Sequence, residues 1–375
     1  MSYFTLPPRR QIAYWLLGSC AMVFVILIVG GITRLTQSGL SITEWEPIRG
    51  LIPPLSQEDW DHYFEAYRAS PEYQKLNRGL PLEEFKGIFW WEYIHRVVAR
   101  IFGLGLLLPA AYFAFRGWLR RWDGVRMLVL LGLVFLQALL GWAMVQTGLG
   151  DHPHVSHYHL AAHLGMALGL FGFMMWWAFR LLHDSSSPGG EGAPSWLYRC
   201  SVAITALIFV QCIWGAFVAG LDAGRLYNTF PRMGEHWMAP AVGELTPLWV
   251  DLTANPVTVQ LVHRLLGMAL VIATLLLWLG FASSGAARSL KKYAAILFAL
   301  TALQMLLGIA TLLLEVPITT AVIHQAMGLL LFGVALRLAF CSSTCAGFQT
   351  LGDSPCRPIG QSHDGDLRID AGGPR

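Results

Sequence analysis

Charged residues are scarce in this chain. Asp, Glu, Lys and Arg make up 13% of its 375 residues, whereas an ordinary soluble domain carries about 25%. Hydrophobic residues make up 55%, and the mean hydropathy is +0.51. This balance excludes an ordinary soluble domain and favours a membrane protein. The net charge of +3 is small, and no basic stripe interleaved with aromatic residues is present, which excludes nucleic-acid binding as well.

Cysteine is sparse, and it is absent from the long connection after the first apolar stretch. Cys20, Cys200 and Cys212 lie in or beside apolar stretches, where thiols usually pack as small hydrophobic groups. The other cysteines follow the last apolar stretch, where too few ligands are present for a metal site. No cysteine occurs between residues 34 and 87, so this long loop cannot use a thiol pair.

Long apolar runs dominate the rest of the chain. A membrane-spanning helix needs about 20 mostly apolar residues. The first run is longer than the core of a signal peptide and lacks a small-residue cleavage site, so we expect a retained helix in a bacterial cytoplasmic membrane. We expect eight spans: Gln11–Thr33, Ile88–Phe115, Arg126–Thr147, His157–Leu182, Arg199–Gly220, Val257–Ala282, Tyr293–Leu314 and Thr319–Phe340.

The connections between these runs alternate in charge and length. The short ones are basic and include Arg9 with Arg10, Arg120 with Arg121, and Lys291 with Lys292. The positive-inside rule places them in the cytoplasm, together with both termini. The long connections, residues 34–87 and 221–256, are rich in aromatic residues and should form ordered lids on the outer surface.

An internal repeat divides the chain into two similar halves. Four helices per half give both halves the same orientation, so the sequence predicts an all-α membrane protein of two four-helix bundles related by a pseudo-two-fold axis. The predicted divisions are residues 1–183, a cytoplasmic linker at 184–198, a second half at 199–340, and a disordered tail at 341–375. The repeat is carried by Glu92-Tyr93-Ile94-His95-Arg96 against Gln260-Leu261-Val262-His263-Arg264, by Gln137 against Gln304, and by His163 against His324.

Four of the 12 histidines lie inside apolar helices, namely His95, His163, His263 and His324. An ionisable group at that depth is costly and usually functional. The structural alternative is a set of histidines hydrogen-bonded across helix interfaces. We expect each of the four about 10 Å below the outer end of its helix. The remaining histidines are expected to be solvated.

Two facing imidazoles at equal depth in a four-helix bundle suit a haem iron, which takes one axial ligand from each side. Zinc would need more converging ligands than each half supplies. The sequence therefore predicts one haem per half, near the outer face. The halves differ at one position, where Glu92 precedes His95 and Gln260 precedes His263. Glu92 is the candidate proton-transfer group, and its structural alternative is an ion pair with Arg96 or Arg100.

Across nearly all of residues 11–340 the sequence resembles the haem A synthase family. A long first outer loop containing Trp45-Glu46-Pro47 resembles the proteobacterial and mitochondrial branch, which lacks the loop cysteine pair of other bacterial members. The resemblance rests on Gly30-Gly31-Ile32-Thr33-Arg34-Leu35-Thr36, Ser38-Gly39-Leu40-Ser41, Glu92-Tyr93-Ile94-His95-Arg96, Leu160-Ala161-Ala162-His163-Leu164, Val262-His263-Arg264 and His324-Gln325.

This resemblance implies an oxidoreductase that converts a methyl group of haem O to a formyl group by successive hydroxylations, giving haem A for cytochrome oxidase. His95 and His163 would bind the iron of the substrate haem O, and Glu92 would assist catalysis. His263 and His324 would hold a haem b cofactor. Candidate partners are haem O synthase, cytochrome oxidase assembly factors, an unidentified electron partner and a second copy of the chain.

Two other functions remain open at this point. A b-type cytochrome subunit for electron transfer would also use histidine pairs, but it normally stacks haems toward opposite faces. A non-enzymatic haem carrier would leave the difference between Glu92 and Gln260 without a purpose.

Overall fold

The computed structural model describes residues 7–44, 49–150, 153–183 and 193–345, and within these ranges the chain is helical, without β-strands. The elements in chain order are α1 Pro8–Leu35, η1 Arg49–Leu51, α2 Gln57–Arg68, α3 Pro71–Lys75, α4 Leu82–Phe115, α5 Arg121–Gly148, α6 His157–Leu182, α7 Ser195–Gly220, η2 Ala223–Arg225, α8 Leu248–Ala254, α9 Pro256–Ser283, α10 Arg288–Leu313 and α11 Ile318–Cys345.

Eight of these helices are long and apolar enough to cross a membrane, which confirms the predicted multi-pass architecture. Several ends differ from the prediction. Helix α4 begins at Leu82 instead of residue 88, because Glu83 and Glu84 favour a helical first turn that hydropathy does not detect. Helix α7 begins at Ser195 instead of residue 199, and α11 continues to Cys345, beyond the predicted end at residue 340.

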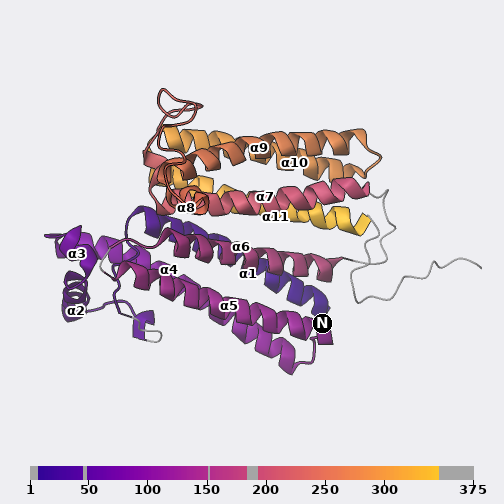
Figure 1. Ribbon diagram of the computed structural model, residues 1–375. Coiled ribbons are helices and arrows are strands. Elements are labelled where there is room, and N and C mark those ends of the chain that lie inside the picture. The colour runs from indigo at the N-terminus through magenta and orange to yellow at the C-terminus, as the bar shows by residue number, and fades with distance from the viewer. Residues whose placement is uncertain (1–6, 45–48, 151–152, 184–192, 346–375) are drawn as a thin grey trace, which may run out of the picture.

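The long helices form two groups that lie side by side (Figure 1). Helices α1, α4, α5 and α6 pack in a ring, in which each contacts the next and α6 returns to α1. Helices α7, α9, α10 and α11 repeat this ring in the same order. Between the groups, α6 contacts α7 and α11, and α1 contacts α11. A two-fold axis between α6 and α11 would produce this set of contacts.

The centre of the interface between the groups is built from phenylalanine against glycine. Phe332 of α11 lies on Gly172 of α6, and Phe171 of α6 lies on Gly333 of α11. The two phenylalanine rings are 6.4 Å apart. Small residues let the helix backbones approach closely, and in a membrane such packing replaces the hydrophobic effect as the cohesive force. The interface therefore depends on the shape of a few side chains.

The outermost helices present apolar side chains to their surroundings. Phe135 of α5 and Leu306 of α10 are 66% and 63% exposed. Within a bilayer these surfaces contact lipid, and such exposure costs little there. Helices α1, α6 and α11 lie at the centre and bury the largest share of their residues.

One end of the bundle carries the segments 36–81 and 221–255, and we call it the loop end (Figure 1). Polar contacts at and near this end join the two groups. The guanidinium of Arg34, at the end of α1, donates to the carbonyl of Ala219 at 2.6 Å and pairs with Asp222 at 3.1 Å. Deeper in the bundle, the amide of Gln325 donates to the carbonyl of Leu27 at 2.9 Å.

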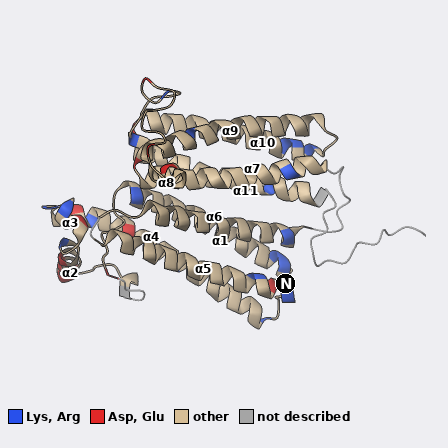
Figure 2. Ribbon diagram, in the orientation of Figure 1, with Lys and Arg blue, Asp and Glu red and all other residues tan. Residues whose placement is uncertain are grey.

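The opposite end of the bundle holds the N-terminus and is rich in Lys and Arg (Figure 2). Few acidic residues accompany them there. This distribution agrees with a cytoplasmic location for that end, although sidedness itself stays a prediction. Residues 184–192 of the predicted linker at 184–198, and residues 346–375 of the tail at 341–375 that was predicted to be disordered, lie outside the described residues. The remaining tail residues, 341–345, continue α11.

The first loop segment is ordered by helix caps and by an aromatic cluster. Ser56 and Asp59 form a reciprocal capping box at the start of α2, and Ser70 caps α3. We define the aromatic cluster as the buried residues Ile42, Tyr67, Phe85 and Phe89 together with Trp60, Tyr63, Phe64 and Tyr73, which pack against them. It covers the first turns of α4. The expected lid is therefore a small folded unit on top of the bundle.

The interface yields a stability prediction. Replacing Phe332 by Ala should lower the free energy of unfolding by about 3 kcal/mol, because a buried ring is lost between helices that cannot close the gap. The lipid-facing Phe135→Ala variant is the matched control and should change stability little. Thermal unfolding of both purified proteins in the same detergent measures the difference. Equal stability of the two variants would show that the phenylalanine contacts do not hold the groups together.

Candidate functional site

The four histidines predicted to bind haem lie on four different helices, His95 on α4, His163 on α6, His263 on α9 and His324 on α11. Each half contributes one pair, and all four side chains are half-buried. His163, His263 and His324 lie within two turns of the first residue of their helices. His95 lies further along α4, because that helix starts earlier than predicted and projects into the aromatic cluster.

The pair in the second half has the spacing of two ligands on one metal ion. The ring centres of His263 and His324 are 6.4 Å apart, and the ring planes are inclined by 76°. Two metal–nitrogen bonds of about 2 Å, plus roughly 1 Å from each nitrogen to its ring centre, give about 6 Å for two imidazoles on opposite sides of an iron. The observed separation therefore leaves room for one iron between the rings.

The pair in the first half is also brought together. His95 on α4 is close enough to His163 on α6 for charges on the two rings to interact. Nε2 of His163 lies 3.3 Å from the amide nitrogen of Gln137 on α5. In the second half, Nε2 of His324 lies 3.5 Å from the equivalent Gln304 on α10. The two sites therefore have matching surroundings.

Each histidine ring lies against a glycine of a neighbouring helix, a feature that the sequence analysis missed. A side chain on any of these glycines would collide with the ring or displace it. The signal was present in the sequence, since glycine occupies equivalent positions in both halves. A Cβ atom would lie 3.0 Å from His95 at Gly30, 3.0 Å from His163 at Gly141, 3.2 Å from His263 at Gly215 and 2.9 Å from His324 at Gly308.

Glutamine side chains fix the helix backbone at the histidines. Gln137 donates to the carbonyl of His163 at 3.2 Å, and Gln304 donates to the carbonyl of His324 at 2.9 Å. Gln211 does the same for His263 at 3.0 Å. Polar contacts between helices hold both position and rotation inside a membrane. Gln137 and Gln304, which mark the repeat in the sequence, and Gln211, which the sequence did not single out, therefore position the helices that carry the histidines.

Ring nitrogens without a hydrogen-bond partner indicate whether the histidines could bind a haem iron. Nδ1 of His163, His263 and His324 is buried and has no hydrogen-bond partner among the described residues. Buried polar atoms are normally satisfied, so an unpaired nitrogen on each ring calls for an explanation. Within the described ranges, no cluster of three or more His, Cys, Asp or Glu residues is arranged to hold a metal ion. Paired imidazoles in an apolar bundle fit haem, which brings its own four nitrogen ligands.

Glu92 is buried, 3% exposed, and its carboxylate is held by several donors. Arg96 donates to Oε1 through two nitrogens, at 2.6 and 3.0 Å. Ser41 and the backbone nitrogen of Ile42 donate to Oε2 at 2.7 and 2.8 Å. The ion pair with Arg96, the structural alternative in the sequence analysis, is thus present. Arg100 instead donates to the carbonyl of Gly50.

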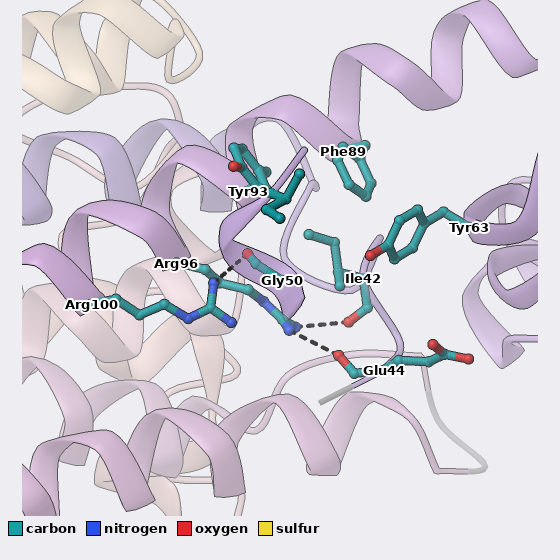
Figure 3. A pocket seen from close by; sticks show the side chains of 9 residues that line it. Ile42, Glu44, Gly50, Tyr63, Phe89, Tyr93, Arg96 and Arg100 are labelled. Carbon is teal, nitrogen blue, oxygen red and sulfur yellow. Dashed lines mark hydrogen bonds between the residues drawn. The ribbon is translucent and has the colours of Figure 1, made fainter. Parts of the chain in front are cut away.

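Two arginines, each one residue after a predicted iron ligand, attach the loop segments to the bundle. Arg96 donates to the carbonyls of Ile42 at 2.7 Å and Glu44 at 3.2 Å (Figure 3). Arg264 donates to the carbonyls of Tyr227 at 2.7 Å, Thr229 at 2.9 Å and Arg232 at 3.2 Å. Charged donors make the stronger hydrogen bonds. Each loop segment is therefore anchored next to the histidine of its own half.

The two arginines differ in their electrostatic balance. Arg96 is paired with the carboxylate of Glu92, whereas Gln260 occupies the corresponding place before Arg264 and donates to the carbonyl of Tyr227. Arg264 is 8% exposed, and among the described residues it donates to backbone carbonyl groups. The second half therefore keeps a buried positive charge that the first half neutralises.

The space beside Arg96 and Arg100 is too small for a substrate. Figure 3 shows both guanidinium groups directed toward backbone carbonyls of the loop segment, with Tyr63, Phe89 and Tyr93 around them. Its free volume of about 10 Å³ corresponds to roughly one water molecule. A haem would have to lie between the paired histidines, below this anchored segment.

Two histidines expected to be solvated are partly buried. Nε2 of His157 and Nδ1 of His159 are buried without a hydrogen-bond partner in the described part of the chain. His157 packs on the ring of Tyr158, with ring centres 4.0 Å apart, and against Gly220 of α7. The prediction of solvated side chains is wrong for these two, because the start of α6 packs under the end of α7 instead of projecting into water.

Comparisons with known proteins show which family the chain resembles. The profile of the family described as Cytochrome oxidase assembly protein (COX15-CtaA) matches residues 13–336. Heme A synthase of Nitrosospira multiformis is 44% identical over 328 residues, which cover 88% of this chain and 92% of that protein. Heme A synthase COX15 of Mus musculus is 43% identical over 343 residues, covering 89% and 83%. A heme A synthase-mitochondrial ferredoxin fusion protein of Schizosaccharomyces pombe is 42% identical over 371 residues, covering 88% and 60%.

The anchoring arginine of the second half gives a testable prediction. Replacing Arg264 by Met should loosen the segment 221–255, because three backbone carbonyls lose a charged donor worth about 1.5–3 kcal/mol each. Limited proteolysis should then cleave this segment faster. Arg225→Met, at an exposed arginine of the same segment, is the control and should be cleaved at the parental rate. Equal protection of both variants would contradict the anchoring role.

Proposed function

This chain belongs to the family of cytochrome oxidase assembly proteins, and we propose that it is a haem A synthase, the oxidoreductase that converts haem O to haem A. One observation carries the proposal: each half brings together two histidines that pack on glycines of neighbouring helices, and the buried carboxylate of Glu92 lies one turn before His95 on α4. The similarity to heme A synthases over 88% of the chain supports it. Neither an electron-transfer cytochrome nor a haem carrier is favoured by these relatives.

We propose that the halves divide the work, with the substrate in residues 1–183 and a haem b cofactor in residues 199–340. The repeated helix contacts and the paired glycines support two sites of common origin related by a pseudo-two-fold axis. The ion pair of Glu92 with Arg96, which has Gln260 and Arg264 as its counterpart, supports a reactive first half. Two sites with the same chemistry would be expected to carry the same residue where this chain has Glu92 in one half and Gln260 in the other.

In the first half, His95 and His163 would bind the iron of haem O and fix the position of its methyl group. The aromatic cluster above α4 would exclude water from the reacting region. Glu92 would accept or donate protons during the successive oxidations of the methyl group to an alcohol and then an aldehyde. Its contacts with Arg96 and Ser41 would keep the carboxylate in one orientation while it does so.

In the second half, His263 and His324 would hold haem b. When bound, this group supplies one-electron redox chemistry. The buried charge of Arg264 would favour the reduced state of the site, because a cation in a low-dielectric region stabilises added negative charge. Gln211 and Gln304 would keep both histidine-bearing helices in register.

The location and partners are also proposed. The cluster of basic residues at the end opposite the loop end supports a bacterial cytoplasmic membrane with the histidine pairs toward the periplasm (Figure 2). A ferredoxin fused to a related heme A synthase supports a small one-electron carrier protein as the electron partner. Haem O synthase, cytochrome oxidase assembly factors and a second copy of this chain remain candidate partners.

The assignment of haem b predicts a specific loss of absorbance. His263→Ala and His324→Ala should each lose the low-spin haem b spectrum from the purified protein, because one axial ligand is removed. His236→Ala, an exposed histidine of the second loop segment, should keep it. Pigment extraction and chromatography would measure haem b separately from haem O and haem A. Full haem b content in both ligand variants would mean that the halves are assigned wrongly.

The role of Glu92 predicts a loss of product without a loss of fold. Glu92→Gln should fold, keep haem b and bind haem O, yet make little or no haem A. The second half already tolerates this pairing, since Gln260 lies before Arg264 there. Glu83→Gln, at an exposed carboxylate of the same helix, is the control.

Haem O, its alcohol and haem A are quantified per mole of folded protein in this comparison. Normal haem A output from Glu92→Gln would remove Glu92 from the mechanism and leave the ion pair with Arg96 as a purely structural contact.

A further inference from the structure

The guanidinium of Arg264 keeps one buried donor that no described neighbour accepts. Its Nη1 and Nη2 atoms donate to backbone carbonyls of the segment 221–255, at distances between 2.7 and 3.2 Å. Its Nε atom is buried and has no hydrogen-bond partner among the described residues. Because Arg264 is 8% exposed, bulk water reaches little of it. A buried donor of this kind calls for an acceptor.

The equivalent arginine of the first half shows which acceptor fits. Nε and Nη2 of Arg96 form one edge of its guanidinium, and both donate to a carboxylate oxygen of Glu92, at 3.0 and 2.6 Å. In the second half Gln260 replaces Glu92, and its amide nitrogen donates to the carbonyl of Tyr227. That carbonyl also accepts from Nη2 of Arg264, so the two side chains meet there. Gln260 nevertheless supplies no acceptor to Nε of Arg264.

Arg264 also lacks a counter-charge within the described part of the chain, where its acceptors are neutral carbonyls. A buried charge is costly unless it is paired. The acidic side chains at the loop end of the second half are engaged elsewhere or face solvent. They are Asp222, which pairs with Arg34, Asp251, which accepts from Asn255 and Thr258, and the exposed Glu235, Glu244 and Glu315.

The ligand proposed for this half carries carboxylates of its own. A haem has carboxylate side chains on one edge and apolar groups on the opposite edge, and the charged edge favours the more polar end of a bundle. The guanidinium of Arg264 lies at that end, because its acceptors belong to the segment 221–255. Arg264 directly follows His263, so its backbone is fixed beside a proposed iron ligand. Arginine is also the side chain that matches a carboxylate best.

We propose that the Nε edge of Arg264 is a carboxylate-binding site, and that its occupant is a carboxylate of the haem held by His263 and His324. This inference rests on the proposed haem site of the second half. The amide oxygen of Gln260, which is buried without a partner among the described residues, accepts from a water molecule bound to the same carboxylate. Arg264 then holds the loop segment through Nη1 and Nη2 and the haem through Nε.

Binding of haem b and of its dimethyl ester tests the site without a change in the second half. A His95→Ala background leaves the second half as the half with both histidines. Each ligand is titrated into haem-free protein in detergent and followed by absorbance. The ester keeps the iron and the ring but loses the negative charges. We expect it to bind about tenfold more weakly, because a charged hydrogen bond to a buried arginine is lost.

The two ways in which this titration could fail have different meanings. Equal affinities for haem b and its ester would overturn the carboxylate site and leave the haem site in place. Binding of neither ligand would refute the proposed haem site of the second half and, with it, this inference.

A Gln260→Glu change supplies the carboxylate from the chain itself, as Glu92 does in the first half. Affinity for haem b should fall about tenfold, to the level of the ester, whereas affinity for the ester should stay unchanged. His236→Glu adds the same charge at an exposed position of the segment 221–255 and should keep the parental preference. A parental preference in Gln260→Glu would contradict the proposal. The comparison of the two ligands on the parent protein does not depend on the folding of this variant.

Acetate separates a haem carboxylate from a free anion at the same site. With the haem carboxylate bound, added acetate should not strengthen the binding of haem b. If a soluble anion were the occupant, haem b and its ester would bind equally, and both would bind more tightly as acetate is added. That result would overturn the assignment to haem.

Limited proteolysis of the segment 221–255 supplies a second readout. At saturation, haem b should slow the cleavage of this segment more than the ester does, because only haem b engages the arginine that anchors it. Equal protection by the two ligands would exclude a link through Arg264 between haem binding and the loop segment.

Discussion

The close approach of four imidazole rings to four glycine backbones is the constraint from which the rest of the site follows. Without a side chain at these glycines, the ring of His324 fits against α10 and that of His263 against α7, and the two rings face each other at 6.4 Å. The rings stay on the glycines only if each helix keeps its rotation about its own axis. Gln211 and Gln304 hold that rotation because they donate to the carbonyls of His263 and His324. The first half repeats this packing of histidine rings on glycines and the glutamine donor to a histidine carbonyl.

The two halves share this framework and differ in charge. The carboxylate of Glu92 pairs with Arg96 in the first half, whereas the partners of Arg264 among the described residues are neutral backbone carbonyls. In a medium of low dielectric constant such a difference acts over long distances. Glu92 and Gln260, at equivalent positions of the two halves, therefore give the histidine pairs different electrostatic surroundings. The loop segments reinforce the difference, because each is tied to the arginine of its own half.

Much of the architecture was predictable, because a bilayer imposes simple rules on composition. The eight spans, the internal repeat and the four histidines followed from apolar length and from ionisable residues at depth. The start of α4 did not, since its first turns lie outside the apolar region and belong to the aromatic cluster. The partners of Glu92 were only partly predictable: Arg96 lies one turn away on the same helix, but Ser41 and Ile42 are distant in sequence. The partners of Arg264 depend on how a loop folds, which no periodic pattern encodes.

The contact between the halves at helix α1 has a consequence for communication between the sites. His95 lies against Gly30, and Gln325, the neighbour of His324 in the chain, lies against Gly31. The two contacts are therefore made by adjacent residues of α1. A displacement of the His95 ring would push on Gly30 and, through the α1 backbone, would shift Gly31 against Gln325 of α11. If each histidine pair holds a haem as proposed, the optical spectrum of one haem would change with the group bound at the other pair.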